Sequence, residues 1–206
     1  MKRKEEQLGI MGGTFNPIHH GHLIAARAAK ERLGLDRLLL LPNARSPLRM
    51  EEALADPEDR LEMVRLAVEE ESGLEACDLE VRREGASFLV ETLAELQGLY
   101  PDATLTFLMG VDSLDTFDRW REVDRIVSLA QVKVMPRPGR AGSEALTALE
   151  ARAPSLAGKV SLMPAGPQVE ISATEVRQRI ASGQSIRYLL PDAVVDYVVD
   201  HGIYGA

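Results

Sequence analysis

Three histidines near the amino terminus are the most chemically suggestive feature of this 206-residue sequence. His19 and His22 flank His20 and Gly21, shortly after the Gly-Gly-Thr of residues 12–14. A spacing of three residues at the start of a helix brings two imidazoles to one side of the turn. Their N–H groups could then donate to phosphate oxygens that gain negative charge as a phosphoryl bond breaks. A turn with incidental histidines, or two ligands of a metal ion, are the alternatives that these residue types leave open.

A second candidate lies far along the chain. Ser172 and Glu175 have the spacing of a capping box, which predicts the start of a helix. Arg177 follows one turn into this helix, whose free N–H groups already favour an anion. Arg177 could therefore clamp an outgoing pyrophosphate. The alternative is an ordinary solvated charge on a helix face.

A third set of residues follows an apolar run at 104–109. Gly110 and Asp112 come where that strand should end, and Trp120, the only tryptophan, follows shortly after. We interpret this as a second ligand-facing edge of a sheet. The alternative for Trp120 is a core or interface position.

The segments that must position these residues alternate between strand-like and helix-like patterns. We predict strands at residues 8–11, 37–41, 79–81, 104–109 and 131–135. We predict helices from about 20 to 34, from an Asp56 cap with Pro57 in the first turn, from Ser87 to Gly98, from Ser172, and from Pro191 to Gly202. Residues 137–157 are interpreted as a loop with a short helix, and Tyr197 and His201 as structural.

This alternation predicts the α/β class: a Rossmann-like, doubly wound, mostly parallel sheet with helices on both faces. Nucleotides bind such sheets in the crevice beyond the carboxyl ends of the strands. Residues 12–22 follow the first predicted strand, so they lie where phosphate should bind. They match neither G-x-G-x-x-G nor the P-loop pattern, so those two phosphate cradles lose support.

Composition restricts the class of protein further. A length of 206 residues and 45% hydrophobic content predict one domain over residues 1–206. The formal net charge of -8 argues against nucleic acid or an anionic membrane as a partner. Cys77 is the only cysteine, which excludes an intramolecular disulfide and a cysteine-based zinc cluster. With neither a signal peptide nor a membrane-length segment, we expect a cytoplasmic protein.

Several motifs, in order, resemble one family. GGTFNPIHHGHL at 12–23 resembles the signature of the HxGH nucleotidyltransferase superfamily, and its fuller form resembles bacterial nicotinate-nucleotide adenylyltransferases. ISATEVR at 171–177 resembles the family's I-S-[SA]-T-x-[IV]-R, and GVDSLDTFDRW at 110–120 resembles G-x-D-S-L-x-x-F-x-x-W. SFLVETL at 87–93 and the R-x-G beginning at Arg137 also match. The sequence departs at Asn16, where Asp is more frequent, and at Leu48, where His is usual.

The resemblance implies an HxGH nucleotidyltransferase fold in which a helical part at about 172–202 completes the ATP site. It implies that the catalytic residues are His19, His22 and Arg177. It assigns ATP binding to Gly12, Gly13, Thr14, Phe15, His19, His22, Gly110, Asp112, Ile171, Ser172, Thr174 and Arg177. It assigns nicotinate mononucleotide binding to Thr14, Asn16, Arg49, Thr92, Trp120 and Arg137. Magnesium is expected on the ATP phosphates, without metal ligands from the protein.

The implied reaction joins ATP and nicotinate mononucleotide to give nicotinate adenine dinucleotide and pyrophosphate. One rival is a sister transferase acting on pantetheine phosphate or an alcohol phosphate, against which Trp120 argues. Another is a nucleotide-binding regulatory protein, against which the full set His19, His22 and Arg177 argues. The sequence decides neither the preference for nicotinate over nicotinamide nor whether the chain associates with itself.

Overall fold

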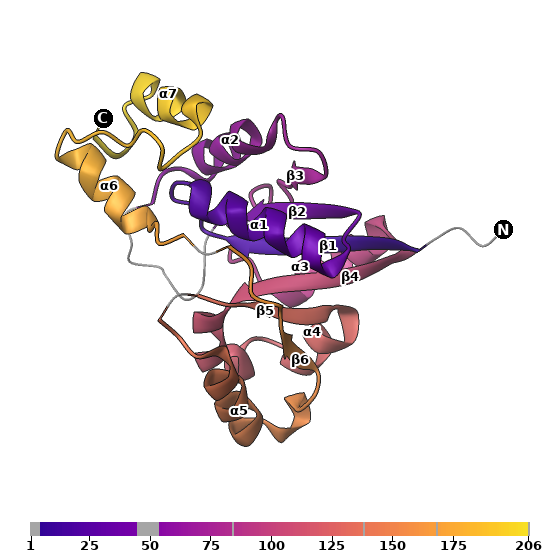
Figure 1. Cartoon of the computed structure of the whole chain (residues 1–206). Helices are drawn as coiled ribbons and strands as arrows, with labels where there is room; N and C mark the ends of the chain where they lie inside the picture. The colour runs from indigo at the N-terminus through magenta and orange to yellow at the C-terminus, as the bar shows by residue number, and fades with distance from the viewer. Residues whose placement is uncertain (1–4, 45–53, 84, 138, 168, 206) are drawn as a thin grey trace.

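Six parallel strands form the central sheet of the computed structural model, which describes residues 5–44, 54–83, 85–137, 139–167 and 169–205 (Figure 1). The strands run in the order β3-β2-β1-β4-β5-β6, and each neighbouring pair is parallel. Their bounds are β1 Glu6–Gly13, β2 Arg37–Pro42, β3 Leu74–Ala76, β4 Ala103–Gly110, β5 Gln131–Met135 and β6 Val160–Leu162.

The strand order places a topological switch point at the centre of the sheet. From β1 the chain steps outward to β2 and β3, then returns to β4 on the other side of β1 and steps outward to β5 and β6. In doubly wound sheets this reversal opens a crevice at the carboxyl ends of the two central strands. The predicted doubly wound α/β fold is therefore confirmed, and the segments after β1 and β4 meet at the switch point.

Helices cover both faces of the sheet. One core cluster includes residues of α1 (His20–Leu33), α2 (Pro57–Val68), α6 (Ala173–Ala181) and α7 (Asp192–Asp200). The other includes residues of α3 (Leu89–Leu99), α4 (Val123–Leu129) and α5 (Gly142–Arg152). Strand β2 shows how the sequence serves both, since Leu38 and Leu40 belong to the first cluster and Leu39 and Leu41 to the second. Burying each such leucine contributes about 1.5–3 kcal/mol.

Four short 3-10 segments lie in the connections, at η1 Val111–Asp115, η2 Phe117–Arg119, η3 Pro154–Leu156 and η4 Ile203–Gly205. Figure 1 shows α6 and α7, close to the carboxyl terminus, beside α1 and α2. The carboxyl-terminal helices thus lie against helices from the first third of the chain. Among the helices of the described residues, none is both long and apolar enough to cross a membrane.

Several helix ends follow the predicted chemistry. Helix α1 ends at Leu33, and Gly34 takes a left-handed φ of 64° while its N–H donates to carbonyls of the last turn. The Oγ of Ser172 accepts a hydrogen bond from the N–H of Glu175 at 3.1 Å. Asp56 is the N-cap of α2 with Pro57 in the first turn, although its carboxylate makes no capping bond.

Three expectations about the elements were wrong, and one strand was missed. Residues 79–81 form a turn instead of a strand, and the edge strand is β3 at Leu74–Ala76. Strand β6 was not predicted; with three residues its pattern is too short to recognise. The N-cap of α3 is Phe88 and not Ser87. Residues 142–152 form an eleven-residue helix, longer than the short one expected in that loop.

Candidate active site

The turn between β1 and α1 carries the paired histidines. Strand β1 ends at Gly13, and His19 is the N-cap of α1. Phe15, in the left-handed region with φ of 46°, turns its ring into the core, where it is 2% exposed. There the ring meets His22 edge-on, with centroids 5.1 Å apart. A Cβ at Gly13 would come within 2.9 Å of the Phe15 ring, so glycine is required for this packing.

His19 and His22 face each other closely. Their rings are stacked, with centroids 3.7 Å apart and planes 20° apart. The Nδ1 of His22 accepts a hydrogen bond from the backbone N–H of His19 at 3.3 Å. Because Nδ1 is the acceptor, neutral His22 carries its proton on Nε2 and can donate it to a ligand. The Nδ1 of His19 is buried and has no hydrogen-bond partner among the described residues.

Both imidazoles are held in the neutral form. Burial and then the neighbouring His20 lower the pKa of His19 to about 4. Burial and then the charge on His19 lower the pKa of His22 well below its ordinary value. Near neutral pH the pair therefore acts as two uncharged N–H donors in the absence of ligand.

The neutral pair predicts a pH-dependent stability. In the unfolded chain a histidine has a pKa of about 6.5, so unfolded chains take up protons in a range where folded ones do not. The free energy of unfolding should fall as pH drops from about 6.5 toward 4, by up to about 1.4 kcal/mol per pH unit for His19 alone. Urea unfolding across this range measures it. A His19→Asn variant should lose stability less steeply, and an unchanged slope would contradict the prediction.

Arg177 connects the second motif to this turn. It lies on α6, and its Nη1 donates to the backbone carbonyl of Asn16 at 2.8 Å. Its Nη2 also donates to the Oγ1 of Thr174 at 3.4 Å. Ile171 lies next to Gly21, since a Cβ built on that glycine would be 3.7 Å from the Cβ of Ile171. The structure thus brings residues 171–177 against the histidine turn.

Asn16 is a buried hub of the same turn. It is 3% exposed, and its Oδ1 accepts hydrogen bonds from the N–H of Ala55 at 3.0 Å and the hydroxyl of Tyr204 at 2.7 Å. These bonds tie the turn to two distant segments. The contact of Asn16 with nicotinate mononucleotide stays a prediction, and the structure gives its Oδ1 a supporting role.

Charged groups gather at the carboxyl ends of β4 and β5. Asp112 accepts hydrogen bonds from Arg137 at 2.6 Å and from Arg140 at 2.7 Å, and Arg140 also donates to Asp115 at 2.6 Å. Partial burial opposes ionisation, but the hydrogen bonds from Arg137 and Arg140 hold the pKa of Asp112 below its ordinary value. Sequence reasoning named Asp112 and Arg137 but missed Arg140. Its signal was the repeat of arginine across Pro-Arg-Pro-Gly-Arg.

The other residues assigned to nicotinate mononucleotide have different surroundings. Trp120 is half-buried, with its Nε1 donating to Thr116 at 3.3 Å and its ring edge-on to Phe117. Thr92 is fully buried, and its hydroxyl donates to Glu80 at 2.8 Å while accepting from Arg83 at 3.0 Å. Burial raises the pKa of Glu80 despite the hydrogen bond from Thr92. Arg49 lies outside the described residues.

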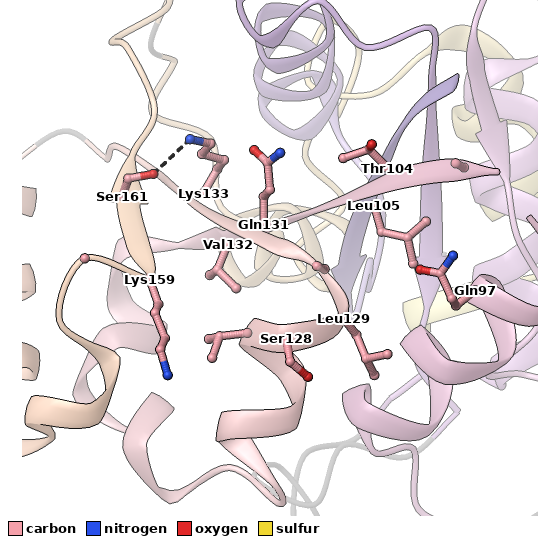
Figure 2. A pocket seen from close by; sticks show the side chains of 14 residues that line it. Gln97, Thr104, Leu105, Ser128, Leu129, Gln131, Val132, Lys133, Lys159 and Ser161 are labelled. Atoms are coloured by element: carbon pink, nitrogen blue, oxygen red, sulfur yellow. Dashed lines mark hydrogen bonds between the residues drawn. The ribbon is translucent and has the colours of Figure 1, made fainter. Parts of the chain in front are cut away.

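One cavity of the described residues lies at a different edge of the sheet. A cavity of about 430 Å³ is lined by residues at the amino ends of β4, β5 and β6. Figure 2 shows Lys133 there, with its Nζ donating to the Oγ of Ser161 at 2.9 Å. Ligands of parallel sheets bind at the opposite, carboxyl edge. The histidine turn and Asp112 follow the carboxyl ends of β1 and β4, and Gly110 is the last residue of β4.

Metal-binding side chains are not clustered in the described part of the chain. No group of three or more His, Cys, Asp or Glu side chains there could hold a metal ion. His19 and His22 lie in a stacked arrangement and contact each other face to face.

Comparison with known proteins gives a consistent result. The cytidylyltransferase-like family model matches residues 10–179. A relative from Roseiflexus sp. (strain RS-1), named a probable nicotinate-nucleotide adenylyltransferase, is 43% identical over 199 residues, covering 96% of this chain and 97% of the relative. The chain belongs to the nicotinate-nucleotide adenylyltransferase family. A second member, from Desulfitobacterium hafniense (strain Y51), is 39% identical over 97% of this chain and 96% of its own length.

Solved structures show the same fold. Plasmodium falciparum nicotinic acid mononucleotide adenylyltransferase complexed with NaAD has a TM-score of 0.77 at 18% identity, with 97% of each chain covered. A putative nicotinate-nucleotide adenylyltransferase from Vibrio parahaemolyticus has a TM-score of 0.68 at 19% identity, covering 97% of this chain and 96% of that one. The chain therefore has the same fold as these two solved structures.

Proposed function

We propose that this chain transfers the adenylyl group of ATP to nicotinate mononucleotide, giving nicotinate adenine dinucleotide and pyrophosphate in NAD biosynthesis. The observation that carries the proposal is that Arg177 contacts the turn that leads into the stacked His19 and His22. The chain is also 43% identical to a relative named a probable nicotinate-nucleotide adenylyltransferase. The turn lies at the carboxyl end of β1, beside the switch point where a nucleotide is expected.

The reaction needs no covalent enzyme intermediate. An oxygen of the acceptor phosphate forms a bond to the α-phosphorus of ATP in line with the departing group, and the bond from that phosphorus to the bridging oxygen breaks to release pyrophosphate. Negative charge spreads over the phosphate oxygens as this happens. His22 donates its Nε2 proton as a hydrogen bond to these oxygens, and His19 and Arg177 face the same charge. Catalysis then consists of positioning and charge stabilisation.

Magnesium enters this proposal as part of the ATP complex. Mg²⁺ prefers phosphate and water oxygens, and it neutralises charge on the transferring group. The described side chains fit an ion that keeps its phosphate ligands: the imidazoles are stacked, and each carboxylate oxygen of Asp112 accepts from an arginine. Arg177, Arg137 and the histidines would then meet the outer phosphate oxygens.

One assay tests the function against its rivals. Purified chain is incubated with ATP, magnesium and one acceptor at a time, and pyrophosphate is measured. The acceptors are nicotinate mononucleotide, nicotinamide mononucleotide and pantetheine phosphate. Pyrophosphate with nicotinate mononucleotide supports the proposal. Release only with pantetheine phosphate would indicate a sister transferase, and ATP binding without release under any condition would indicate a regulatory binding protein.

Trp120 provides a test of the acceptor site. If its half-buried ring stacks on the pyridine ring of nicotinate mononucleotide, Trp120→Ala should raise the KM for that substrate by about tenfold or more, because stacking on an aromatic ring contributes about 1–3 kcal/mol. The KM for ATP should stay within about twofold, and Trp120→Phe should restore part of the loss. Steady-state kinetics with each substrate varied separately measures this. Equal increases in both KM values would instead indicate that the variant disturbs the packing against Phe117.

A further inference from the structure

A buried arginine lies beneath the histidine turn. Arg60 of α2 is 0% exposed, and the described residues give its guanidinium three hydrogen bonds, all to backbone carbonyls. Its Nη1 donates to Thr14 at 2.8 Å, its Nη2 to Ala44 at 3.1 Å and its Nε to Ala55 at 3.0 Å. A buried guanidinium that ends on carbonyls is unusual, because burial of a charge is costly unless it is paired.

The location of Arg60 suggests a reason for burying a charge despite its free-energy cost. Thr14 is part of the turn that is expected to receive the ATP phosphates, so a fixed positive charge on the inner side of the turn favours an anion on the outer side. The chain as a whole carries a formal net charge of -8, which opposes the approach of a polyphosphate. The rigid fork of a guanidinium also fixes three carbonyls at once, which a lysine ammonium does less well.

A tyrosine at the end of the chain holds the next residues of the same turn. The hydroxyl of Tyr204 donates to the Oδ1 of Asn16 at 2.7 Å, and Arg177 donates to the carbonyl of Asn16 at 2.8 Å. Tyr204 has a φ of 63°, a left-handed conformation that a tyrosine adopts only when surrounding contacts impose it. The turn is therefore fastened by side chains from α2, α6 and the carboxyl-terminal segment.

We propose that Arg60 and Tyr204 are positioning residues for adenylyl transfer, acting through Thr14 and Asn16. This inference rests on the proposed function. Neither side chain reaches the reacting atoms; Arg60 fixes the carbonyl of Thr14, and Tyr204 fixes the carboxamide of Asn16. Together they set the orientation of the turn that carries the phosphate-facing backbone and leads into His19 and His22.

The chain offers a matched control for Tyr204. The hydroxyl of Tyr197 on α7 donates to Asp59 of α2 at 3.0 Å. This bond joins the carboxyl-terminal part to α2 and does not touch the turn. Tyr197→Phe should therefore lower the melting temperature slightly and leave kcat and both KM values unchanged. Tyr204→Phe removes a comparable bond and should lower kcat about 2- to 10-fold.

The Arg60 variants separate charge from geometry. Arg60→Met should lower kcat/KM for ATP about 100-fold, since a misplaced turn forfeits alignment and the buried charge is gone. Arg60→Lys keeps the charge without the fork and should recover part of that loss. Pyrophosphate release, melting temperatures and calorimetric ATP binding are measured for each variant. If Arg60→Met does not fold, Arg60→Lys and the two tyrosine variants test the positioning role in its place.

Two results would overturn the positioning role. One is a Tyr204→Phe variant whose kcat matches that of Tyr197→Phe; the other is an Arg60→Lys variant with wild-type kinetics and a lowered melting temperature. Failure of the proposed function appears differently, as a wild-type chain that binds ATP but releases no pyrophosphate with nicotinate mononucleotide. In that case weaker ATP binding by Arg60→Lys and Tyr204→Phe would still support the arrangement of the turn, and unchanged binding would refute it.

Discussion

Replacing His22 with alanine is expected to lower the turnover number about 10²- to 10³-fold, or about 3–4 kcal/mol of transition-state stabilisation. The Nδ1 of His22 accepts from the backbone of His19, which leaves Nε2–H as the donor toward the phosphate oxygens. The lowered pKa keeps this group neutral, so it donates without transferring its proton. The effect should fall mainly on kcat, because the charge that His22 stabilises develops in the transition state.

The comparison variants for this prediction test the chemistry of the donor. His201→Ala removes an exposed imidazole that stacks on Tyr197 and should leave kcat unchanged. His22→Gln can place an amide N–H near the position of Nε2 and should recover part of the activity. Single-turnover kinetics at saturating ATP provides the rate of the chemical step. A rate for His22→Ala within threefold of the wild type would remove His22 from the mechanism.

Local pattern was sufficient to predict the parts of the site that are close in sequence. The first strand, expected to end at Met11 and observed to end at Gly13, and the helix that starts at His20 follow from apolar runs and turn residues. The three-residue spacing predicted two imidazoles on one side. The capping bond of Ser172 is equally local. The doubly wound sheet could be predicted because each long strand is a continuous apolar run between helical segments.

Contacts between distant segments could not be read from the sequence. Asn16 looked like a ligand-facing turn residue, but Ala55 and Tyr204 occupy its Oδ1 only because α2 and the chain end pack there. The family resemblance assigned Thr92 to nicotinate mononucleotide, yet its buried hydroxyl donates to Glu80. Arg60 lacked any motif at all. Its α2 pattern of Leu61, Val64 and Ala67 predicts a core face without showing that the adjacent arginine is buried with it.

The prediction of short edge strands was wrong for a related reason. Residues 79–81 and 160–162 are both three-residue segments with an apolar residue at each end, and only the second forms a strand. At that length, pairing with a neighbouring strand decides the outcome, because intrinsic preference is weak and depends on context. Strand β6 pairs with β5 through Val160, Ser161 and Leu162.

The net charge could be read from the sequence, but the positions of the individual charges could not. The net charge of -8 predicted repulsion of polyanions, so any phosphate site had to be local. The structure shows how locality is achieved: Arg60 and Arg177 hold the histidine turn, and Arg137 and Arg140 converge on Asp112 at the neighbouring strand ends. These arginines therefore supply positive charge next to the segments that follow β1, β4 and β5.

Replacing Gly21 with alanine should separate activity from stability. A Cβ at this position would lie 3.0 Å from the Nδ1 and 3.1 Å from the Cε1 of His19, closer than ordinary contacts. The imidazole must therefore shift, and because it stacks on His22 the pair moves together. A displacement of catalytic groups by about 1 Å can cost on the order of 10²-fold in rate. Because these contacts require His19 to move by only a few tenths of an ångström, we expect a smaller loss in kcat, about 10-fold.

The stability of Gly21→Ala, in contrast to its activity, should change little. Gly21 lies in the first turn of α1, where alanine is favoured over glycine by up to about 1 kcal/mol in a helix. That gain offsets much of the strain at His19, so the free energy of unfolding should change by less than about 1 kcal/mol. Urea unfolding and pyrophosphate release on the same preparation measure both quantities. A Gly21→Ala enzyme with wild-type kcat would show that the histidines act from positions other than their stacked arrangement, and it would weaken the assignment of His22 with it.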